Sequence, residues 1–135
     1  MRHWVIDTNV VVSGLLVPRG PSARVLDALF DGRLKLVYDA RILAEYRDVL
    51  HRPRLQLAPD KIQAFLAGLE SQVRVIPKAI SATAPDADDL VFVEAALATT
   101  DKTIVTGNLA HYPPDLLQGT RVLTPAQAAA ELAQQ

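Results

Sequence analysis

The chain has 135 residues, half of them hydrophobic and 21% charged, with a formal net charge of −1. This composition excludes a disordered chain, and the near-neutral charge gives no overall attraction to nucleic acid or anionic membranes. The absence of cysteine excludes disulfides, thiolate zinc sites and a cysteine nucleophile. We expect a single domain over residues 1–135.

The elements follow one another in an alternating pattern. Short apolar runs alternate with amphipathic stretches, which is typical of βαβ units and a mainly parallel sheet. The predicted strands are residues 3–7, 34–38, 73–76, 102–106 and 120–123. The predicted helices are residues 10–16, 22–31, 40–50, 59–72, 89–98 and 126–133. Asp39, Asp60 and Thr124 mark helix starts, and residues 77–85 form a loop rich in Pro, Ala and Ser.

We do not expect the N-terminal apolar segment to be a signal peptide or a membrane span. Asp7 and Asn9 interrupt it, and no small-residue cleavage site follows. No apolar run in the chain approaches the length of a membrane span. We therefore expect a cytoplasmic protein without membrane association.

Polar residues stand where strands end and a central helix begins. Asp7 closes the first predicted strand, and Asn108 lies two residues beyond Thr106. Asp86, Asp88 and Asp89 crowd the start of an almost wholly apolar helix, DLVFVEAALA. Ligands of open parallel sheets bind beyond the carboxyl ends of the strands, so these residues are expected near one site.

Glu45 joins this set through a helical-wheel argument. In the helix 40–50 the apolar stripe includes Ile42, Tyr46 and Val49, and Glu45 borders it at 100° per residue. Its side chain is therefore expected to point over the sheet edge toward Asp7.

Each position also has a simpler interpretation. Asp7 can form a turn or cap a helix, Asp88 or Asp89 can be an N-cap, and Asn108 is an ordinary turn residue. Glu45 alone is typical of a solvated helix charge. The common location of all four positions favours a site.

A cluster of carboxylates has a specific chemistry. Two carboxylates at roughly 4 Å repel by about 4 kcal/mol at a surface-like dielectric, so such a cluster needs a cation or protons. Oxygen ligands without cysteine, in a chain whose histidines are scattered, favour Mg²⁺ or Mn²⁺ over Zn²⁺. Such a metal can activate water against a phosphodiester. The residues alone thus predict metal-dependent phosphoryl chemistry.

The segments VIDTNVVVSGLL, ILAEYRDVL, DADDLVFVEAALA and IVTGN together resemble a PIN domain, in that family's order and over essentially the whole chain. The closest resemblance is to toxin ribonucleases of toxin–antitoxin systems, the relatives of VapC. It implies a three-layer α/β/α sandwich with a central, mainly parallel five-stranded sheet. The implied activity is metal-dependent cleavage of single-stranded RNA, and the implied partners are a cognate antitoxin and a second copy of the chain.

The resemblance also assigns roles to residues. Asp7, Glu45 and Asp89 become catalytic, metal-binding acids. Thr8, Asn9 and Thr106 become supporting residues that orient the carboxylates. Asp86, Asp88 and Asn108 are further candidate ligands.

One position departs from the family pattern. Where PIN domains usually have TGD, this chain has Thr106-Gly107-Asn108. Asparagine offers a carbonyl oxygen but no charge, so we expect one metal site and a weakened second one. The alternative is a degenerate PIN module that binds RNA or a protein partner without cleavage.

RNA contacts are expected from arginines near the site, although solvation or pairing with neighbouring acids explains each of them equally well. The candidate RNA-binding residues are Arg19, Arg24, Arg41, Arg47 and Arg52, with Arg54 beside them.

A receiver-type domain is disfavoured, because such a domain carries its phosphoacceptor aspartate at the end of a middle strand. Here Pro77 and Lys78 follow the middle strand instead.

Overall fold

A computed structural model describes residues 1–80 and 87–134. Its centre is one sheet of five strands in the order β3-β2-β1-β4-β5, and every neighbouring pair is parallel. The strands are β1 (Arg2–Ile6), β2 (Leu34–Tyr38), β3 (Val73–Arg74), β4 (Thr103–Val105) and β5 (Arg121–Leu123). The predicted five-stranded parallel sheet is confirmed.

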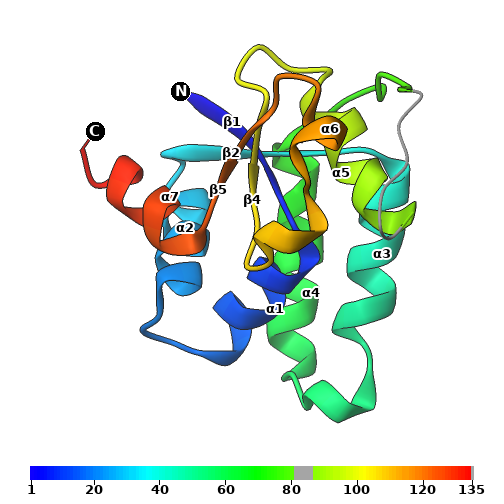
Figure 1. Cartoon of the computed structure of the whole chain (residues 1–135). Helices are drawn as coiled ribbons and strands as arrows, with labels where there is room; N and C mark the ends of the chain where they lie inside the picture. The colour runs from blue at the N-terminus through cyan, green and yellow to red at the C-terminus, as the bar shows by residue number, and fades with distance from the viewer. Residues whose placement is uncertain (81–86, 135) are drawn as a thin grey trace.

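Helices cover both faces of this sheet (Figure 1). Helix α5 contacts β1, β2 and β4, while α2 packs against α1, α7 and β2. The α-helices are α1 (Thr8–Leu16), α2 (Pro21–Phe30), α3 (Ala40–Leu50), α4 (Pro59–Gly68), α5 (Ala87–Ala96), α6 (Pro114–Leu117) and α7 (Pro125–Leu132). Three short 3₁₀ turns are η1 (Pro53–Leu55), η2 (Leu69–Ser71) and η3 (Leu109–His111). The arrangement is the expected three-layer α/β/α sandwich.

Local sequence explains where several helices begin. The Asp39 side chain accepts hydrogen bonds from the backbone N–H groups of Arg41 and Ile42, capping α3 as predicted. Thr124 and Gln127 form a reciprocal capping box at the start of α7.

The structure also differs from the predicted boundaries. The helix expected over residues 59–72 ends as an α-helix at Gly68 and continues as the η2 turn, within which the Ser71 hydroxyl donates a hydrogen bond to the Gly68 carbonyl. Strand β3 has only two residues, and η1, η3 and α6 were not predicted. The segment between β4 and β5, which contains η3 and α6, therefore has more helical structure than the sequence predicted.

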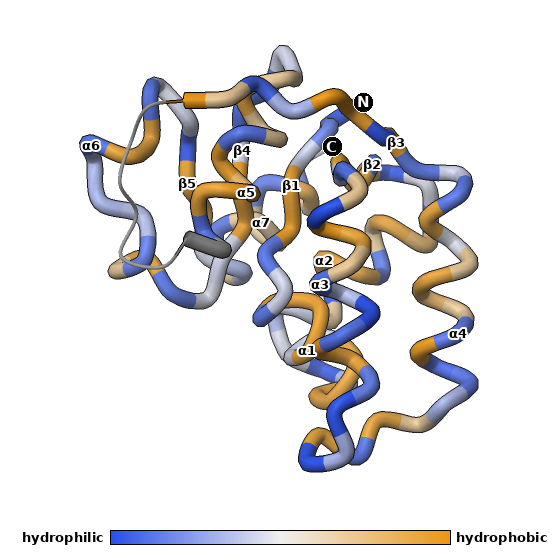
Figure 2. The backbone as a smooth tube through the Cα atoms, turned by 90° about the vertical axis from the view of Figure 1, so that its right-hand side faces the viewer, coloured by the Kyte–Doolittle hydropathy of each residue, from blue (hydrophilic) through white to orange (hydrophobic). Residues whose placement is uncertain are grey.

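The core follows the expected pattern. Trp4, Val5 and Ile6 of β1 are almost completely buried, and so are Phe92 and Val93 of α5. In Figure 2, β1 is hydrophobic toward its carboxyl end, whereas apolar and hydrophilic residues alternate along the outer helix α4. Among the described helices, none has both the length and the apolar character needed to cross a membrane.

Candidate active site

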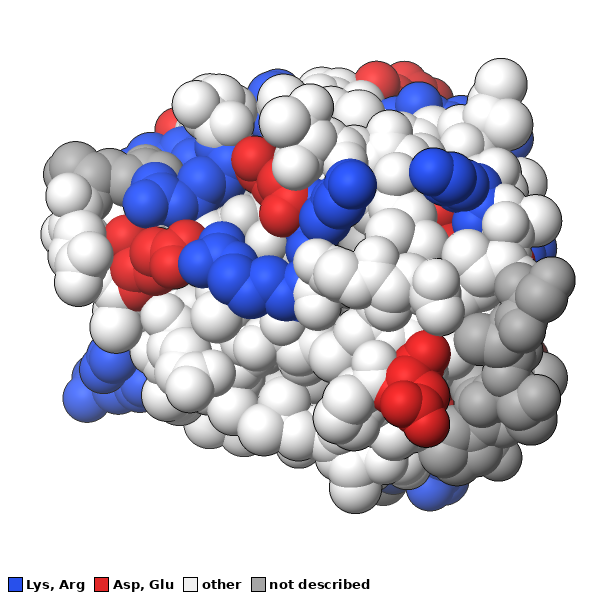
Figure 3. Space-filling model, turned by 45° about the horizontal axis from the view of Figure 1, so that its top comes forward, with Lys and Arg blue, Asp and Glu red and all other residues white. Residues whose placement is uncertain are grey.

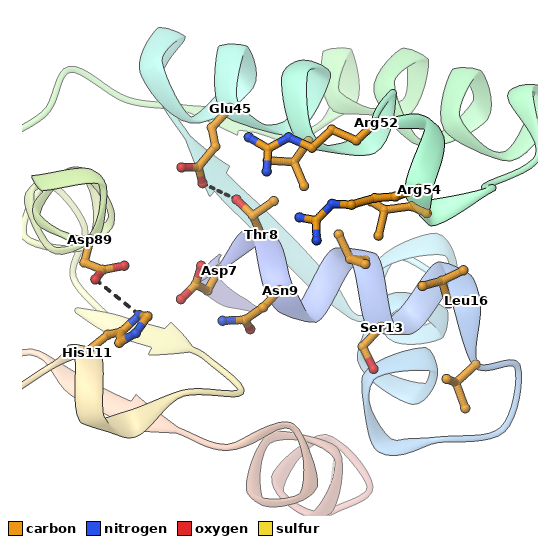
Figure 4. A pocket seen from close by; sticks show the side chains of 14 residues that line it. Asp7, Thr8, Asn9, Ser13, Leu16, Glu45, Arg52, Arg54, Asp89 and His111 are labelled. Atoms are coloured by element: carbon orange, nitrogen blue, oxygen red, sulfur yellow. Dashed lines mark hydrogen bonds and ion pairs between the residues drawn. The ribbon is translucent and has the colours of Figure 1, made fainter. Parts of the chain in front are cut away.

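A pocket of about 670 Å³ adjoins the carboxyl end of β1. Strand β1 lies between β2 and β4: the chain continues from β1 to β2 on one side of it and later returns to form β4 on the other side. The carboxyl end of β1 is therefore the topological switch point of the sheet. Asp7, Glu45 and Asp89 all line the pocket, and their side chains converge from the start of α1, from α3 and from α5 (Figure 4). We refer to it as the acidic pocket. The structure thus brings together the three acids that the sequence singled out.

Asp7 is 5% exposed and is held by residues far away in the sequence. It occupies the N-cap position of α1, yet among the described contacts its carboxylate makes no capping hydrogen bond. Instead, its Oδ2 accepts hydrogen bonds from the Thr106 hydroxyl at 2.8 Å and from the Tyr112 hydroxyl at 2.9 Å. The interpretation of this aspartate as a simple helix cap is therefore wrong.

Glu45 is half-buried and faces the acidic pocket, as the helical-wheel argument predicted. Its Oε2 accepts a short hydrogen bond from the Thr8 hydroxyl (Figure 4). Thr8 thus orients Glu45, a residue on another element, and not its neighbour Asp7.

Asn9 connects α1 to the turn after β4. Its Oδ1 accepts a hydrogen bond from the Gly107 backbone N–H at 2.9 Å, and its Nδ2 lies 3.5 Å from the Thr106 hydroxyl. A Cβ atom at Gly107 would lie 3.2 Å from Asn9 Oδ1, so glycine allows this close approach. Asn9 and Thr106 therefore support the geometry around Asp7.

Asp89 is 6% exposed and lies in the first turn of α5. Its Oδ2 lies 3.3 Å from Nδ1 of His111, which also lines the acidic pocket (Figure 4). The other acids predicted near this helix start, Asp86 and the side chain of Asp88, lie outside the described residues.

Asn108 points toward the same histidine. Its Nδ2 lies 2.8 Å from Nε2 of His111, and its backbone N–H donates to the Thr106 hydroxyl. Asn108 is not among the described residues that line the acidic pocket. It lines a neighbouring cavity of about 330 Å³, together with Asn9 and Gly107.

His111 and Tyr112 are functional candidates that the sequence argument missed. Scattered histidines have no ligand spacing, and one tyrosine in a turn has no recognisable pattern. Both residues lie within six positions of Thr106, in the segment that follows β4. This proximity in the sequence was the signal that could have marked them as site residues.

Two tyrosine hydroxyls near Asp7 remain protonated. Burial, and after it the charge of Asp7, raise the pKa values of both Tyr46 and Tyr112 far above the ordinary tyrosine value. The Tyr46 hydroxyl donates to the Ile6 carbonyl at 2.5 Å, and the Tyr112 hydroxyl donates to Asp7. Both groups are therefore hydrogen-bond donors throughout the neutral range.

The candidate RNA-binding arginines divide into groups. Arg52 lines the acidic pocket and pairs with Asp48 at 2.9 Å, and Arg54 lines it too. In Figure 4 both guanidinium groups reach back along α1 toward Thr8. Within the described part of the chain, the lining of this pocket does not include Arg19, Arg24, Arg41 or Arg47.

Arg41 is engaged in a structural ion-pair network. It bonds Asp39 at 2.9 Å and Glu94 at 2.8 Å, and these two acids are nearly buried. Desolvation lowers the pKa of the Arg41 guanidinium, but the bonds to Asp39 and Glu94 outweigh it and raise that pKa overall. Glu94, a buried acid within an apolar helix that the sequence argument passed over, also accepts the N–H of Ile80 at 3.0 Å. For Arg41, pairing with neighbouring acids, the alternative to an RNA contact, therefore agrees with the structure.

Charge on the outer surface is mixed. On the face seen in Figure 3, blue basic side chains lie directly beside red acidic ones. This agrees with the net charge of −1, and Arg52 and Arg54 are the arginines that line the acidic pocket together with its acids.

The donor atoms fit a hard divalent cation. The pocket lining includes three carboxylates, the oxygen-bearing side chains of Thr8, Asn9 and Ser13, and the His111 imidazole. Among the residues that the structure describes, no group of three or more His, Asp or Glu side chains lies close enough together to hold a metal ion. Mg²⁺ keeps several waters and binds through one or two carboxylates, so a complete cage is not required.

Comparison with known proteins identifies the family. A search of curated proteins gives no match. A family model described as the PIN domain matches residues 3–110, which include Asp7, Glu45, Asp89 and Asn108. Because this match covers most of the chain, the protein belongs to the PIN domain family.

Proposed function

We propose that this protein is a metal-dependent endoribonuclease that cleaves single-stranded RNA and acts as the toxin of a toxin–antitoxin system. PIN domains are in general nucleases, and the chain has their fold. The observation that carries the proposal is the convergence of Asp7, Glu45 and Asp89 in one pocket at the switch point of the sheet.

Asp7, Glu45 and Asp89 would hold Mg²⁺ or Mn²⁺. A bound ion of this kind activates water and neutralises the charge that develops at phosphorus. The Thr106 and Tyr112 hydroxyls both donate to Oδ2 of Asp7 and so fix the orientation of this carboxylate, which lines the pocket. Thr8 fixes Glu45 in the same way. These hydroxyls keep the acids oriented before any ligand arrives.

The substrate would enter past the two arginines. Arg52 and Arg54 stand on the side of the pocket formed by the end of α3 and by η1, where they can neutralise phosphates on either side of the scissile bond. We expect single-stranded RNA as the substrate from the resemblance to PIN-domain toxin ribonucleases, and aliphatic side chains in the pocket lining offer apolar contacts to unstacked bases.

The test is cleavage of a labelled single-stranded RNA by the purified protein with Mn²⁺, with Mg²⁺ and with a chelator. We expect cleavage with either metal, loss of cleavage with the chelator and little cleavage of DNA of the same sequence. Undiminished cleavage in the presence of the chelator contradicts the metal dependence.

The alternative is a module that binds RNA or a protein without cutting. Asn108, which replaces the usual acid of the family motif, favours it. RNA binding without cleavage at any metal concentration supports this second function.

The proposal includes two protein partners. A cognate antitoxin that covers the acidic pocket is supported by Leu16 and Val17, which line the pocket and are about half exposed. A homodimer is proposed from the resemblance alone. Co-purification with the product of the adjacent gene, and the mass of the purified protein in solution, test these two partners separately.

A further inference from the structure

Three side chains form a continuous chain beside the acidic pocket. Asn108 Nδ2 lies 2.8 Å from His111 Nε2, and His111 Nδ1 lies 3.3 Å from Asp89 Oδ2. The Asp89 side chain is 8% exposed, whereas that of His111 is 43% exposed. An accessible imidazole therefore stands against a buried carboxylate, with an amide behind it.

The chemistry of the two end groups determines which nitrogen of the imidazole carries the proton. A carboxylate oxygen only accepts hydrogen bonds, so the approach of Nδ1 to Asp89 is attractive when Nδ1 carries the proton. An amide NH₂ only donates, so its contact with Nε2 requires a lone pair there. The neutral Nδ1–H tautomer accepts the hydrogen bond from Asn108 and makes the 3.3 Å contact with Asp89 electrostatically attractive, whereas the Nε2–H tautomer makes both contacts repulsive.

We propose that Asn108 and His111 are positioning residues for Asp89, with Asn108 selecting the Nδ1–H tautomer of His111 and that N–H orienting the carboxylate. Their role in metal binding rests on the proposed function, in which Asp89 is a ligand. The inference explains why an amide can replace the usual acid at residue 108. An aspartate at that position would place an acceptor against the Nε2 lone pair.

The segment that follows β4 thus positions two acids of the pocket. Thr106 and Tyr112 hold Asp7, while Asn108 and His111 hold Asp89. Partners of this kind commonly change metal affinity or activity by about 10- to 100-fold when they are removed.

The tautomer is measurable without metal or substrate. Long-range ¹H–¹⁵N correlation spectra of the metal-free protein at mildly alkaline pH distinguish the two nitrogens of each histidine. We expect His111 as the Nδ1–H tautomer in the wild type and as a mixture in Asn108→Leu, which keeps similar bulk but lacks the donor. His3 and His51 provide internal controls and should not change.

An Nε2–H tautomer in the wild type overturns the inference, and so does a His111 spectrum that Asn108→Leu leaves unaltered. Thermal unfolding of the variant verifies that it is folded. Asn108→Ala provides a second variant without the donor if the leucine is not tolerated.

Mn²⁺ titration by calorimetry then tests the link to the metal. We expect Asn108→Leu to weaken Mn²⁺ binding about tenfold, His111→Ala to weaken it further, and the exposed control Gln118→Leu to leave it unchanged. Unchanged affinity in Asn108→Leu overturns the positioning role alone. Absence of Mn²⁺ binding by the wild type overturns the proposed function and the metal-related role together, whatever the tautomer.

Discussion

The hydroxyl of Tyr112 donates a 2.9 Å hydrogen bond to Oδ2 of Asp7, a residue 105 positions earlier in the chain. Tyr112 is 4% exposed, so this bond is shielded from water. Together with the bond from Thr106 it fixes one oxygen of a carboxylate that lines the acidic pocket. The orientation of Asp7 is therefore set by the segment that follows β4, and not by α1.

Tyr112→Phe tests this relationship because it removes one hydroxyl and keeps the buried ring. We expect RNA cleavage and Mn²⁺ affinity to fall about tenfold, and the free energy of unfolding to fall by about 1 kcal/mol. Tyr38→Phe is the matched control, since the Tyr38 hydroxyl donates to the Leu69 carbonyl, and neither residue lines the acidic pocket. Equal loss of activity in both variants would show that the effect is only structural.

Alkaline pH should destabilise the wild type more than this variant. The pKa of Tyr112 is raised in the folded protein, so its contribution to stability is complete below the ordinary value of 10.0 and is lost as pH rises above it. We expect the urea midpoint to decline above about pH 10, less steeply in Tyr112→Phe than in the wild type. Parallel declines in the two proteins contradict this assignment.

Most of the fold follows from local patterns in the sequence. The 3.6-residue periodicity, the short apolar runs and the caps at Asp39 and Thr124 place every strand and the long helices to within a few residues. The errors lie where non-local contacts or short turns decide, as at η2, η3 and α6. Such turns of three or four residues are too short to show a hydrophobic period.

The acids of the site were predictable, whereas the residues that hold them were not. Asp7, Glu45 and Asp89 stand at strand or helix positions that topology brings together. Tyr112 and His111 reach the site through the path of the turn after β4, which no periodic pattern encodes. The predicted support of Thr106 for Asp7 is present, and Thr8 supports Glu45 from across the pocket.

Arg41→Met should affect stability and not the site. The change leaves Asp39 and Glu94 nearly buried without their cation. We expect a loss of about 1 to 2 kcal/mol in the free energy of unfolding, less than for a fully buried pair because Arg41 is 43% exposed. Mn²⁺ affinity should stay at the wild-type value, and a large change in that affinity contradicts the separation of this network from the site.

Asn108→Asp distinguishes the catalytic proposal from the non-cleaving alternative. In this structure Asn108 contacts His111 and lines a neighbouring cavity, so a new carboxylate there should not increase RNA cleavage. A large gain in cleavage would instead identify a site crippled by the loss of an acid, as the degenerate-module hypothesis requires.

Arg54→Ala should weaken RNA binding uniformly across sequences. If Arg54 contacts one phosphate, the slope of log affinity against log salt for single-stranded RNA should decrease by about 0.7. Arg24→Ala is the control, because Arg24 is exposed and the acidic pocket is lined by other described residues. Equal changes in both variants would indicate a diffuse electrostatic attraction and no specific contact at the pocket.

The most direct test of the central claim is Mn²⁺-dependent cleavage of single-stranded RNA by the wild type, Asp7→Asn and Asp60→Asn. Asp7 lines the acidic pocket, whereas Asp60 is an exposed acid in the first turn of α4, so the two variants lose the same charge at different places. The account predicts that Asp7→Asn abolishes cleavage while remaining folded and that Asp60→Asn cleaves like the wild type. Wild-type cleavage by Asp7→Asn would contradict it.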